Sequence, residues 1–239
     1  MSRPVTTNYL SHYGHFANAA YHRFESWSDC APCQEFDDIA QFNLTAAWST
    51  TTMPAFSRGF VGVHSQRQEV VVVYRGTTHP MDVLADSQVI QPRYMASREI
   101  MKDALGKLVM EYPTYDVHFV GHSLGGAQAT LAFLEAVSDT SSFGDIRLVT
   151  FGAPRVGNAV FAQYANAQLS SKHSALRVTH ESDIIPHLPS SLLPKHYMHS
   201  DQETPSALPA HSRCSGTCTT TCTIPGLALT VPEYIRQSE

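Results

Sequence analysis

Charged residues are scarce in this chain of 239 residues: Asp, Glu, Lys and Arg make up 15% of it, against roughly 25% in a typical soluble domain. The 16 basic and 21 acidic residues leave a formal net charge of -5, and the basic residues form no cluster. Nucleic-acid-binding surfaces need such a cluster, so the composition argues against a nucleic-acid partner. A surface with so little charge suits a secreted protein better than a cytosolic one.

Long hydrophobic runs are also absent. No stretch approaches the roughly 20 apolar residues of a membrane span, and the first ten residues lack the hydrophobic core of a signal peptide. The chain is therefore either cytosolic or the mature form of a secreted protein. The low charge and the cysteines favour the mature secreted form.

Cysteines are few and occur in two groups, Cys30 with Cys33 and then Cys214, Cys218 and Cys222. Such close groups indicate local disulfides formed in an oxidising compartment, with one cysteine left over. A redox or zinc site is the alternative, but the second group has no metal-type pairing with histidine. Asn43 begins an Asn-Leu-Thr sequon and is a possible glycosylation site.

The chain has no repeat and no interdomain linker before a tail rich in Ser, Thr, Pro and Cys that starts near Thr204. We therefore expect one domain over residues 1–239, with a tail held by disulfides. The apolar pattern predicts helices and strands that alternate along the chain. The expected helices are Phe16–Phe24, Ser97–Glu111, Leu124–Val137 and Asn158–Leu169, and the expected strands are Phe60–Ser65, Glu69–Arg75, Val117–Val120, Ile146–Phe151 and Leu176–His180.

Strands separated by helices predict an α/β fold with a mostly parallel sheet, whose functional residues lie at the carboxyl ends of the strands. The clearest such end is Val117–Val120 followed by Gly-His-Ser-Leu-Gly-Gly at 121–126 and a helical run. A strand, this turn and a helix form the nucleophile elbow of an α/β-hydrolase, with Ser123 as nucleophile. The alternative is a tight turn in which the glycines have no catalytic role.

A serine hydroxyl is a weak nucleophile and needs a base oriented by an acid, which follow the nucleophile in the order acid and then His in this fold. Asp183, just past the strand Leu176–His180, is the expected acid, with Glu181 as its rival; a simple turn cap is the structural alternative. His187 is too close in sequence to the acid to serve as base. The residue pattern leaves His196, His199 and His211 open.

The oxyanion of the tetrahedral intermediate needs two hydrogen-bond donors. One is the N–H of Leu124, directly after the nucleophile. The second is expected from Thr77, because the strand Glu69–Arg75 ends in Arg-Gly-Thr and Gly76 permits a bend there. A plain turn is the alternative at this position.

Four motifs occur in an order that resembles the fungal class 3 lipase family, which also contains feruloyl esterases. They are Val-Tyr-Arg-Gly-Thr at 73–77, Gly-His-Ser-Leu-Gly-Gly at 121–126, Thr-Phe-Gly-Ala-Pro-Arg-Val-Gly-Asn at 150–158 and Asp-Ile-Ile-Pro-His-Leu-Pro at 183–189. The resemblance implies an α/β-hydrolase with a Ser123, Asp183 and late-His triad and with Thr77 and Leu124 as oxyanion donors. Tyr197 to Glu203 is similar to the family's Tyr-x-His-x-x-x-Glu segment, which implies His199 as base.

The resemblance also implies a short disulfide loop between Cys30 and Cys33. A cysteine that many members have near the position of His22 is missing, so the pairing of the three late cysteines stays open. The lid segment after Thr77 has no tryptophan, and its apolar side consists of Met81, Val83 and Leu84. We expect a small lid of this kind to bring the protein to a lipid surface only transiently.

Together these features predict a secreted, monomeric serine carboxylic-ester hydrolase, a triacylglycerol lipase in the first instance, that acts on lipid or ester substrates at an oil–water interface. No cofactor or metal is implied. The first alternative is a feruloyl or aryl esterase of the same family. The second is a catalytically silent binding protein on the same fold.

Overall fold

The computed structural model describes residues 6–50, 56–77, 90–139, 144–170, 173–179, 183–190, 197–200, 213–214 and 222–223. Within these ranges, one sheet has the strand order β1-β2-β3-β4-β5-β7-β10-β9. Its strands are β1 (Asn43–Ser49), β2 (Arg58–His64), β3 (Glu69–Tyr74), β4 (Asp116–His122), β5 (Ile146–Phe151), β7 (His173–Thr179), β9 (Arg213–Cys214) and β10 (Cys222–Thr223). A separate two-stranded ladder joins β6 (Gly157–Asn158) to β8 (Tyr197–Met198).

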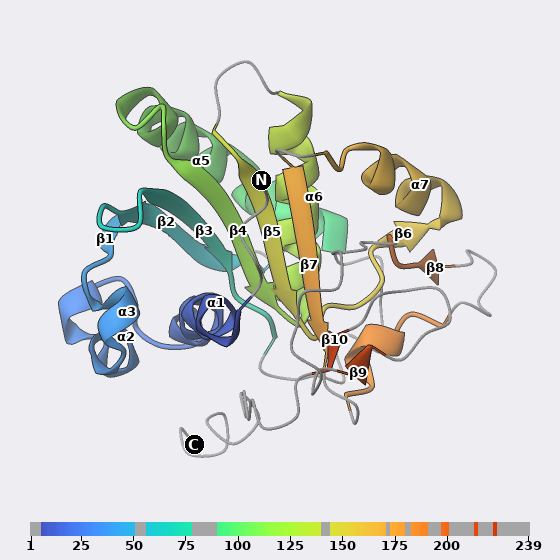
Figure 1. The fold of residues 1–239 in the computed structure, drawn as a ribbon, viewed down its shortest axis with the longest axis horizontal. Coiled ribbons are helices and arrows are strands. Elements are labelled where there is room, and N and C mark those ends of the chain that lie inside the picture. Colours follow the sequence, from blue (N-terminus) through green and yellow to red (C-terminus); the bar gives the residue numbers. More distant parts are fainter. Residues whose placement is uncertain are drawn as a thin grey trace.

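The strands β3, β4, β5 and β7 pair in parallel, which confirms the predicted mostly parallel sheet. Figure 1 shows their arrowheads at one edge of the sheet. The segments that follow these strands therefore meet at that edge. They carry the candidate catalytic residues.

Both faces of the sheet are buried. Along β3, Val70 and Val72 belong to one core cluster, and Val71 and Val73 belong to the other. The first cluster includes residues of α5 (Ile90–Glu111), α6 (Leu124–Ser138) and α7 (Ala159–Ala167). The second includes residues of α1 (Thr7–Ala19), α2 (Ala31–Glu35) and α3 (Asp37–Ala40). The two sets of helices thus cover opposite faces, as expected for an α/β-hydrolase.

Several element boundaries differ from the sequence prediction. The helix expected over Phe16–Phe24 is α1, which begins at Thr7 because the Thr6 side chain accepts a hydrogen bond from the Tyr9 N–H at 3.2 Å. Helix α5 begins at Ile90 and not at Ser97, since Ile90 and Tyr94 continue its buried face. Strand β1 was not predicted. Only Trp48 is buried in it, so its apolar pattern is weak.

The disulfide between Cys30 and Cys33 is present, with a Cα–Cα distance of 5.1 Å. In the tail, Cys214 and Cys222 are register partners across β9 and β10, whereas Cys218 lies outside the described residues. Asn43, the residue of the sequon, is exposed at the start of β1. Its glycosylation stays a prediction.

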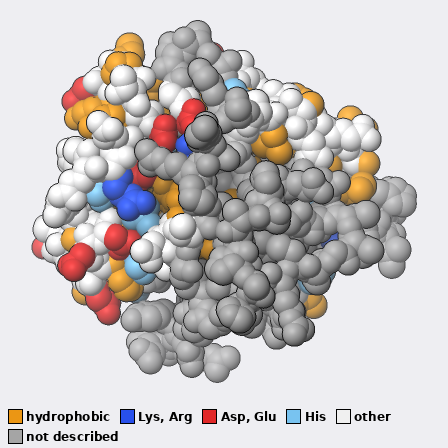
Figure 2. All heavy atoms as spheres, in the orientation of Figure 1, with side chains coloured by type: hydrophobic (Ala, Val, Ile, Leu, Met, Phe, Trp, Pro, Cys, Tyr) orange, Lys and Arg blue, Asp and Glu red, His pale blue; other side chains and the backbone are white. Residues whose placement is uncertain are grey.

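The described surface carries little charge on the face drawn in Figure 2. The largest group of Lys and Arg atoms there is one small spot with acidic and His side chains beside it, and most of the other described atoms are uncharged. Among the described residues, no helix is long and apolar enough to cross a membrane.

Candidate active site

Ser123 occupies the turn between β4 and α6, with φ 53° and ψ -129°. A positive φ is uncommon for a residue with a side chain and is found at strained functional turns. The Ser123 N–H donates to the Phe151 carbonyl at 2.8 Å, which ties the turn to the end of β5. A Cβ on Gly121 would lie 2.3 Å from the Gly125 carbonyl oxygen, so this tight turn requires glycine. The local geometry is that of a nucleophile elbow.

The two expected oxyanion donors flank this turn. Leu124 is the first residue of α6, so its N–H has no acceptor within the helix and lies at the positive end of the helix dipole. The segment after β3 passes directly beside the elbow: a Cβ on Gly76 would lie 3.2 Å from Ser123 Cβ. Thr77 is the next residue. The roles of Leu124 and Thr77 stay predictions.

Asp183 follows β7, at the same edge of the sheet as Ser123. Its Oδ1 accepts a hydrogen bond from the Ile185 N–H at 2.9 Å. Its Oδ2 lies 2.6 Å from the position that a Cβ on Gly152 would take, and Gly152 has a φ of 58°. Gly152 follows Phe151, whose carbonyl holds Ser123. The fold therefore brings the nucleophile candidate after β4 and the acid candidate after β7 to either side of the end of β5, while Glu181 lies outside the described residues.

His199 follows β8 and is bonded to the loop that carries the acid candidate. Its Nε2 donates to the Pro186 carbonyl at 2.6 Å. Burial lowers the pKa of His199 to about 3, and the nearby positive charge of Arg177 acts in the same direction. The ring is therefore neutral near neutral pH and keeps Nδ1 as its acceptor.

Within the described part of the chain, no hydrogen bond joins His199 to Ser123 Oγ. A general base works best with a pKa near the operating pH. In this conformation His199 is a weak base that anchors a loop. Its role as the base stays a prediction, and the rivals His196 and His211 lie outside the described residues.

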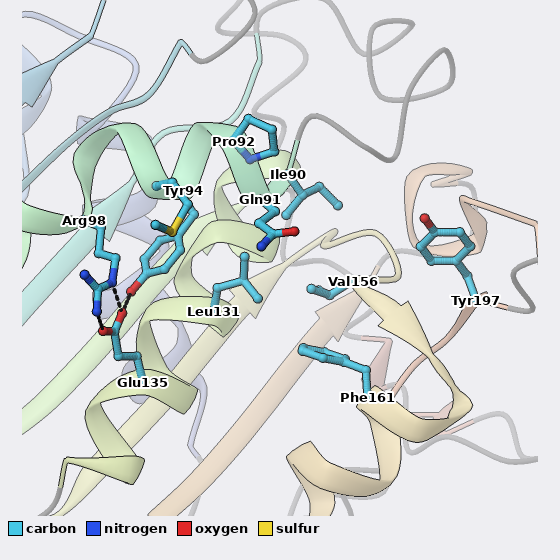
Figure 3. Close-up of a pocket in the computed structure, with 11 residues that line it drawn as sticks. Ile90, Gln91, Pro92, Tyr94, Arg98, Leu131, Glu135, Val156, Phe161 and Tyr197 are labelled. Carbon is cyan, nitrogen blue, oxygen red and sulfur yellow. Dashed lines mark hydrogen bonds and ion pairs between the residues drawn. The ribbon is translucent and has the colours of Figure 1, made fainter.

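A groove of about 850 Å³ lies between α5, α6, α7 and β8 (Figure 3). Its wall is formed by Ile90, Gln91, Pro92, Tyr94, Met95, Arg98, Leu131, Glu135, Val156, Phe161 and Tyr197. Ile90, Leu131 and Val156 also pack in the cluster that contains Leu124, so the groove and the elbow share one apolar wall.

One end of the groove is polar. Arg98 Nε donates to Glu135 at 2.9 Å, and the Tyr94 hydroxyl donates to the same carboxylate (Figure 3). Sequence reasoning missed this groove. The available signal was the spacing of Ile90, Tyr94 and Arg98 along one helix face. The lid candidates Met81, Val83 and Leu84 lie outside the described residues. Within the described residues, no group of three or more His, Cys, Asp or Glu side chains could hold a metal ion.

Comparisons with known proteins point to one family. The family model described as Lipase (class 3) matches residues 89–193. A Caenorhabditis elegans lipase is 34% identical over 149 residues, 55% of this chain and 41% of the relative. The secreted mono- and diacylglycerol lipase A of Penicillium camembertii is 30% identical over 161 residues, 61% of this chain and 50% of the relative.

A solved structure of the Rhizomucor miehei triacylglyceride lipase has a TM-score of 0.71 at 25% identity, over 82% of this chain and 80% of that one. This agreement confirms the α/β-hydrolase fold. The chain spans about half the length, or less, of the two curated relatives.

Proposed function

We propose that this chain, which resembles the class 3 lipase family over residues 89–193, is a serine carboxylic-ester hydrolase that acts first of all as a triacylglycerol lipase through an acyl-enzyme. The observation that carries the proposal is the position of Ser123. It sits at a positive φ on a glycine-flanked turn, between the segments that offer two oxyanion donors.

In the proposed reaction, Ser123 Oγ attacks the ester carbonyl as a histidine accepts its proton. The N–H groups of Leu124 and Thr77 stabilise the oxyanion. The alcohol then leaves with the proton from the histidine, and water hydrolyses the acyl-enzyme by the same steps. Asp183 orients the imidazole and stabilises its positive form.

His199 is the proposed base. To act, its ring has to turn from the Pro186 carbonyl toward Ser123 Oγ, which would also bring it out of the surroundings that now lower its pKa. His196 and His211 are the alternatives for this step.

The groove supports a lipid substrate. Along α6, Leu131 lies about 10 Å and Glu135 about 16 Å from Leu124, at 1.5 Å of rise per residue. An acyl chain bound to Ser123 would run along the apolar part of the groove toward the Tyr94–Arg98–Glu135 end. We also propose that the protein is secreted, as the Penicillium relative is by its name, is a monomer, and contacts lipid surfaces transiently.

The test combines labelling with turnover. Wild-type protein is expected to react with a fluorophosphonate and to hydrolyse both nitrophenyl butanoate and a triacylglycerol emulsion. Ser123→Ala is expected to lose labelling, to lose turnover by a factor on the order of 10⁴ to 10⁶, and to remain folded. A Ser123→Ala variant within tenfold of wild type contradicts the proposal. Turnover of feruloyl esters without turnover of the emulsion would favour the esterase alternative.

A further inference from the structure

Tyr21 stands just past the end of α1, beside the elbow but outside the predicted triad and oxyanion set. Its hydroxyl lies 2.7 Å from Nδ1 of His122, the residue directly before Ser123. Because burial lowers the pKa of His122 to about 4 and raises that of Tyr21 well above its usual value, both groups are neutral near neutral pH. Neutral groups allow either direction for this hydrogen bond, and we assign the tyrosine O–H as the donor and His122 Nδ1 as the acceptor.

The same hydroxyl also meets the segment after β3. A Cβ on Gly76 would lie 2.3 Å from Tyr21 Oη and 2.5 Å from the His122 carbonyl oxygen. A hydrogen bond with the Gly76 backbone partly offsets the rise in the pKa of Tyr21 that burial causes. Tyr21 therefore touches both segments that carry the proposed oxyanion donors, one residue before Thr77 and two residues before Leu124.

This assignment sets the tautomer of His122. With Nδ1 as acceptor, the proton of neutral His122 is on Nε2. That nitrogen lies 3.8 Å from the position a Cβ on Gly152 would take, and Asp183 Oδ2 lies 2.6 Å from the same position. His122 Nε2 and Asp183 Oδ2 therefore both lie close to Gly152.

We propose that Tyr21 is a positioning residue for ester hydrolysis, which sets the separation of the two oxyanion donors and holds His122 in the Nε2–H form beside Asp183. The inference rests on the proposed function. Oxyanion donors act only when they are placed within a few tenths of an ångström of the developing charge, so a contact that spans both segments affects the transition state more than substrate binding.

The Arg75 guanidinium lies over the Tyr21 ring. Its guanidinium carbon lies 5.6 Å from the centre of the Tyr21 ring. This contact depends on the ring and not on the hydroxyl. Tyr21→Phe therefore keeps the ring, its packing and the cation–π contact, and removes only the group that bridges Gly76 and His122.

Tyr21→Phe is expected to lower kcat for nitrophenyl butanoate by about 10- to 100-fold, the usual effect of losing a group that orients a reacting one. KM should change less than about twofold. The matched control is Tyr164→Phe, which removes a phenol hydroxyl that contacts Ser138 Oγ on the far part of the molecule. The control should keep wild-type kcat, and both variants should keep the wild-type melting temperature within a few degrees.

A double-mutant cycle with His122→Leu separates positioning from general damage. If the two residues act as one unit, the double variant loses no more kcat than the worse single variant. Wild-type kcat in Tyr21→Phe, a loss confined to KM, or fully additive losses in the cycle would each overturn the inference. A wild-type protein that neither labels with a fluorophosphonate nor hydrolyses esters would instead overturn the proposed function.

Discussion

At the scale of single residues, the site separates into a part held by strand ends and a part held by loops. Ser123 and Asp183 are placed by backbone contacts with Phe151, Gly152 and Ile185, so their positions follow from the sheet. His199 is held by one hydrogen bond to Pro186. The identity of the base is therefore the least determined part of the proposed triad.

We predict that His199→Ala reduces turnover as far as Ser123→Ala does, because residues that act as a unit fail together. His196→Ala and His211→Ala should keep most of the activity. Turnover of one short-chain ester is measured for all three variants, and thermal unfolding checks that each variant is folded under the assay conditions.

The hydrogen bond between His199 and Pro186 suggests a competing outcome, in which His199 is not the base. If His199 only anchors the Pro186 loop, His199→Ala should lower turnover by no more than about 100-fold. The loss should then come with a lower melting temperature, because the loop is no longer held. The full loss would appear in His196→Ala or His211→Ala. That result would assign the role of base to whichever histidine shows the full loss, and would leave the assignments of Ser123 and Asp183 unchanged.

The sequence could predict that Ser123 and Asp183 follow strand ends, because a glycine pair around a serine and a carboxylate after a strand each have a local backbone cause; their catalytic roles stay predictions. It could not predict Tyr21 or the His199–Pro186 contact. Tyr21 and His122, which share a hydrogen bond, are about a hundred residues apart in the sequence. No local pattern specifies which loop atoms a distant tyrosine or histidine will meet.

At the scale of elements, α6 has two tasks. Its first turn presents the Leu124 N–H, and its later turns form the wall of the groove through Leu131 and Glu135. The sequence predicted the helix as Leu124–Val137, close to its observed bounds of Leu124–Ser138. The groove was not predicted because it also needs the first turns of α5, where polar residues such as Gln91 and Arg93 weaken the apolar pattern.

We predict that Leu131→Trp blocks the groove and changes the preference for acyl length. Turnover of nitrophenyl palmitate should fall at least tenfold, because the indole fills the space in which a long chain would lie. Turnover of nitrophenyl butanoate should fall less than about threefold, because a short chain stays near Ser123. Leu131 is only partly buried, so the larger ring can be accepted without rebuilding the core.

Met110→Trp is the matched control, since Met110 is 78% exposed on the far end of α5. It should leave the ratio of the two rates unchanged. Equal losses for both esters in Leu131→Trp would mean that the long chain does not lie in this groove.

At the scale of the whole molecule, a buried polar network lies at the opposite end of the parallel strands from Ser123. Glu69 begins β3, and its carboxylate accepts a hydrogen bond from the Tyr13 hydroxyl at 2.7 Å and contacts His12 Nε2 at 2.5 Å. His118 of β4 contacts the Tyr13 hydroxyl at 3.1 Å.

Acidification is expected to destabilise the folded protein, because the folded state lowers the pKa of each of three buried groups, His118, His122 and Glu69. Burial lowers the pKa of His118 from 6.5 to about 3 and that of His122 to about 4. The unfolded chain therefore takes up protons at these positions below pH 6.5 while the folded chain does not, so stability falls with pH. Burial alone would raise the pKa of Glu69, but hydrogen bonds with His12 and Tyr13 hold it at about 2, below its usual 4.5, so its contribution is lost between those values.

One unit of pKa difference corresponds to about 1.4 kcal/mol, and the whole stability of a domain is about 5–15 kcal/mol. Three groups shifted by two units or more are therefore enough to decide whether the chain stays folded. We predict that the melting temperature is nearly constant above pH 6.5, falls steadily below it, and drops further below pH 4.5. The measurement is thermal unfolding across this range at fixed ionic strength.

His118→Phe keeps an aromatic ring against Tyr13, which His118 stacks on at 4.6 Å between ring centroids, but removes one titrating group. Its melting temperature should therefore fall less steeply between pH 6.5 and pH 4.5 than that of the wild type, even if its absolute value is lower. Exposed histidines such as His187 supply the comparison, because His187→Phe should leave the slope unchanged. A wild-type melting temperature that stays level down to pH 4.5 would show that His118 and His122 are not held neutral in the folded protein.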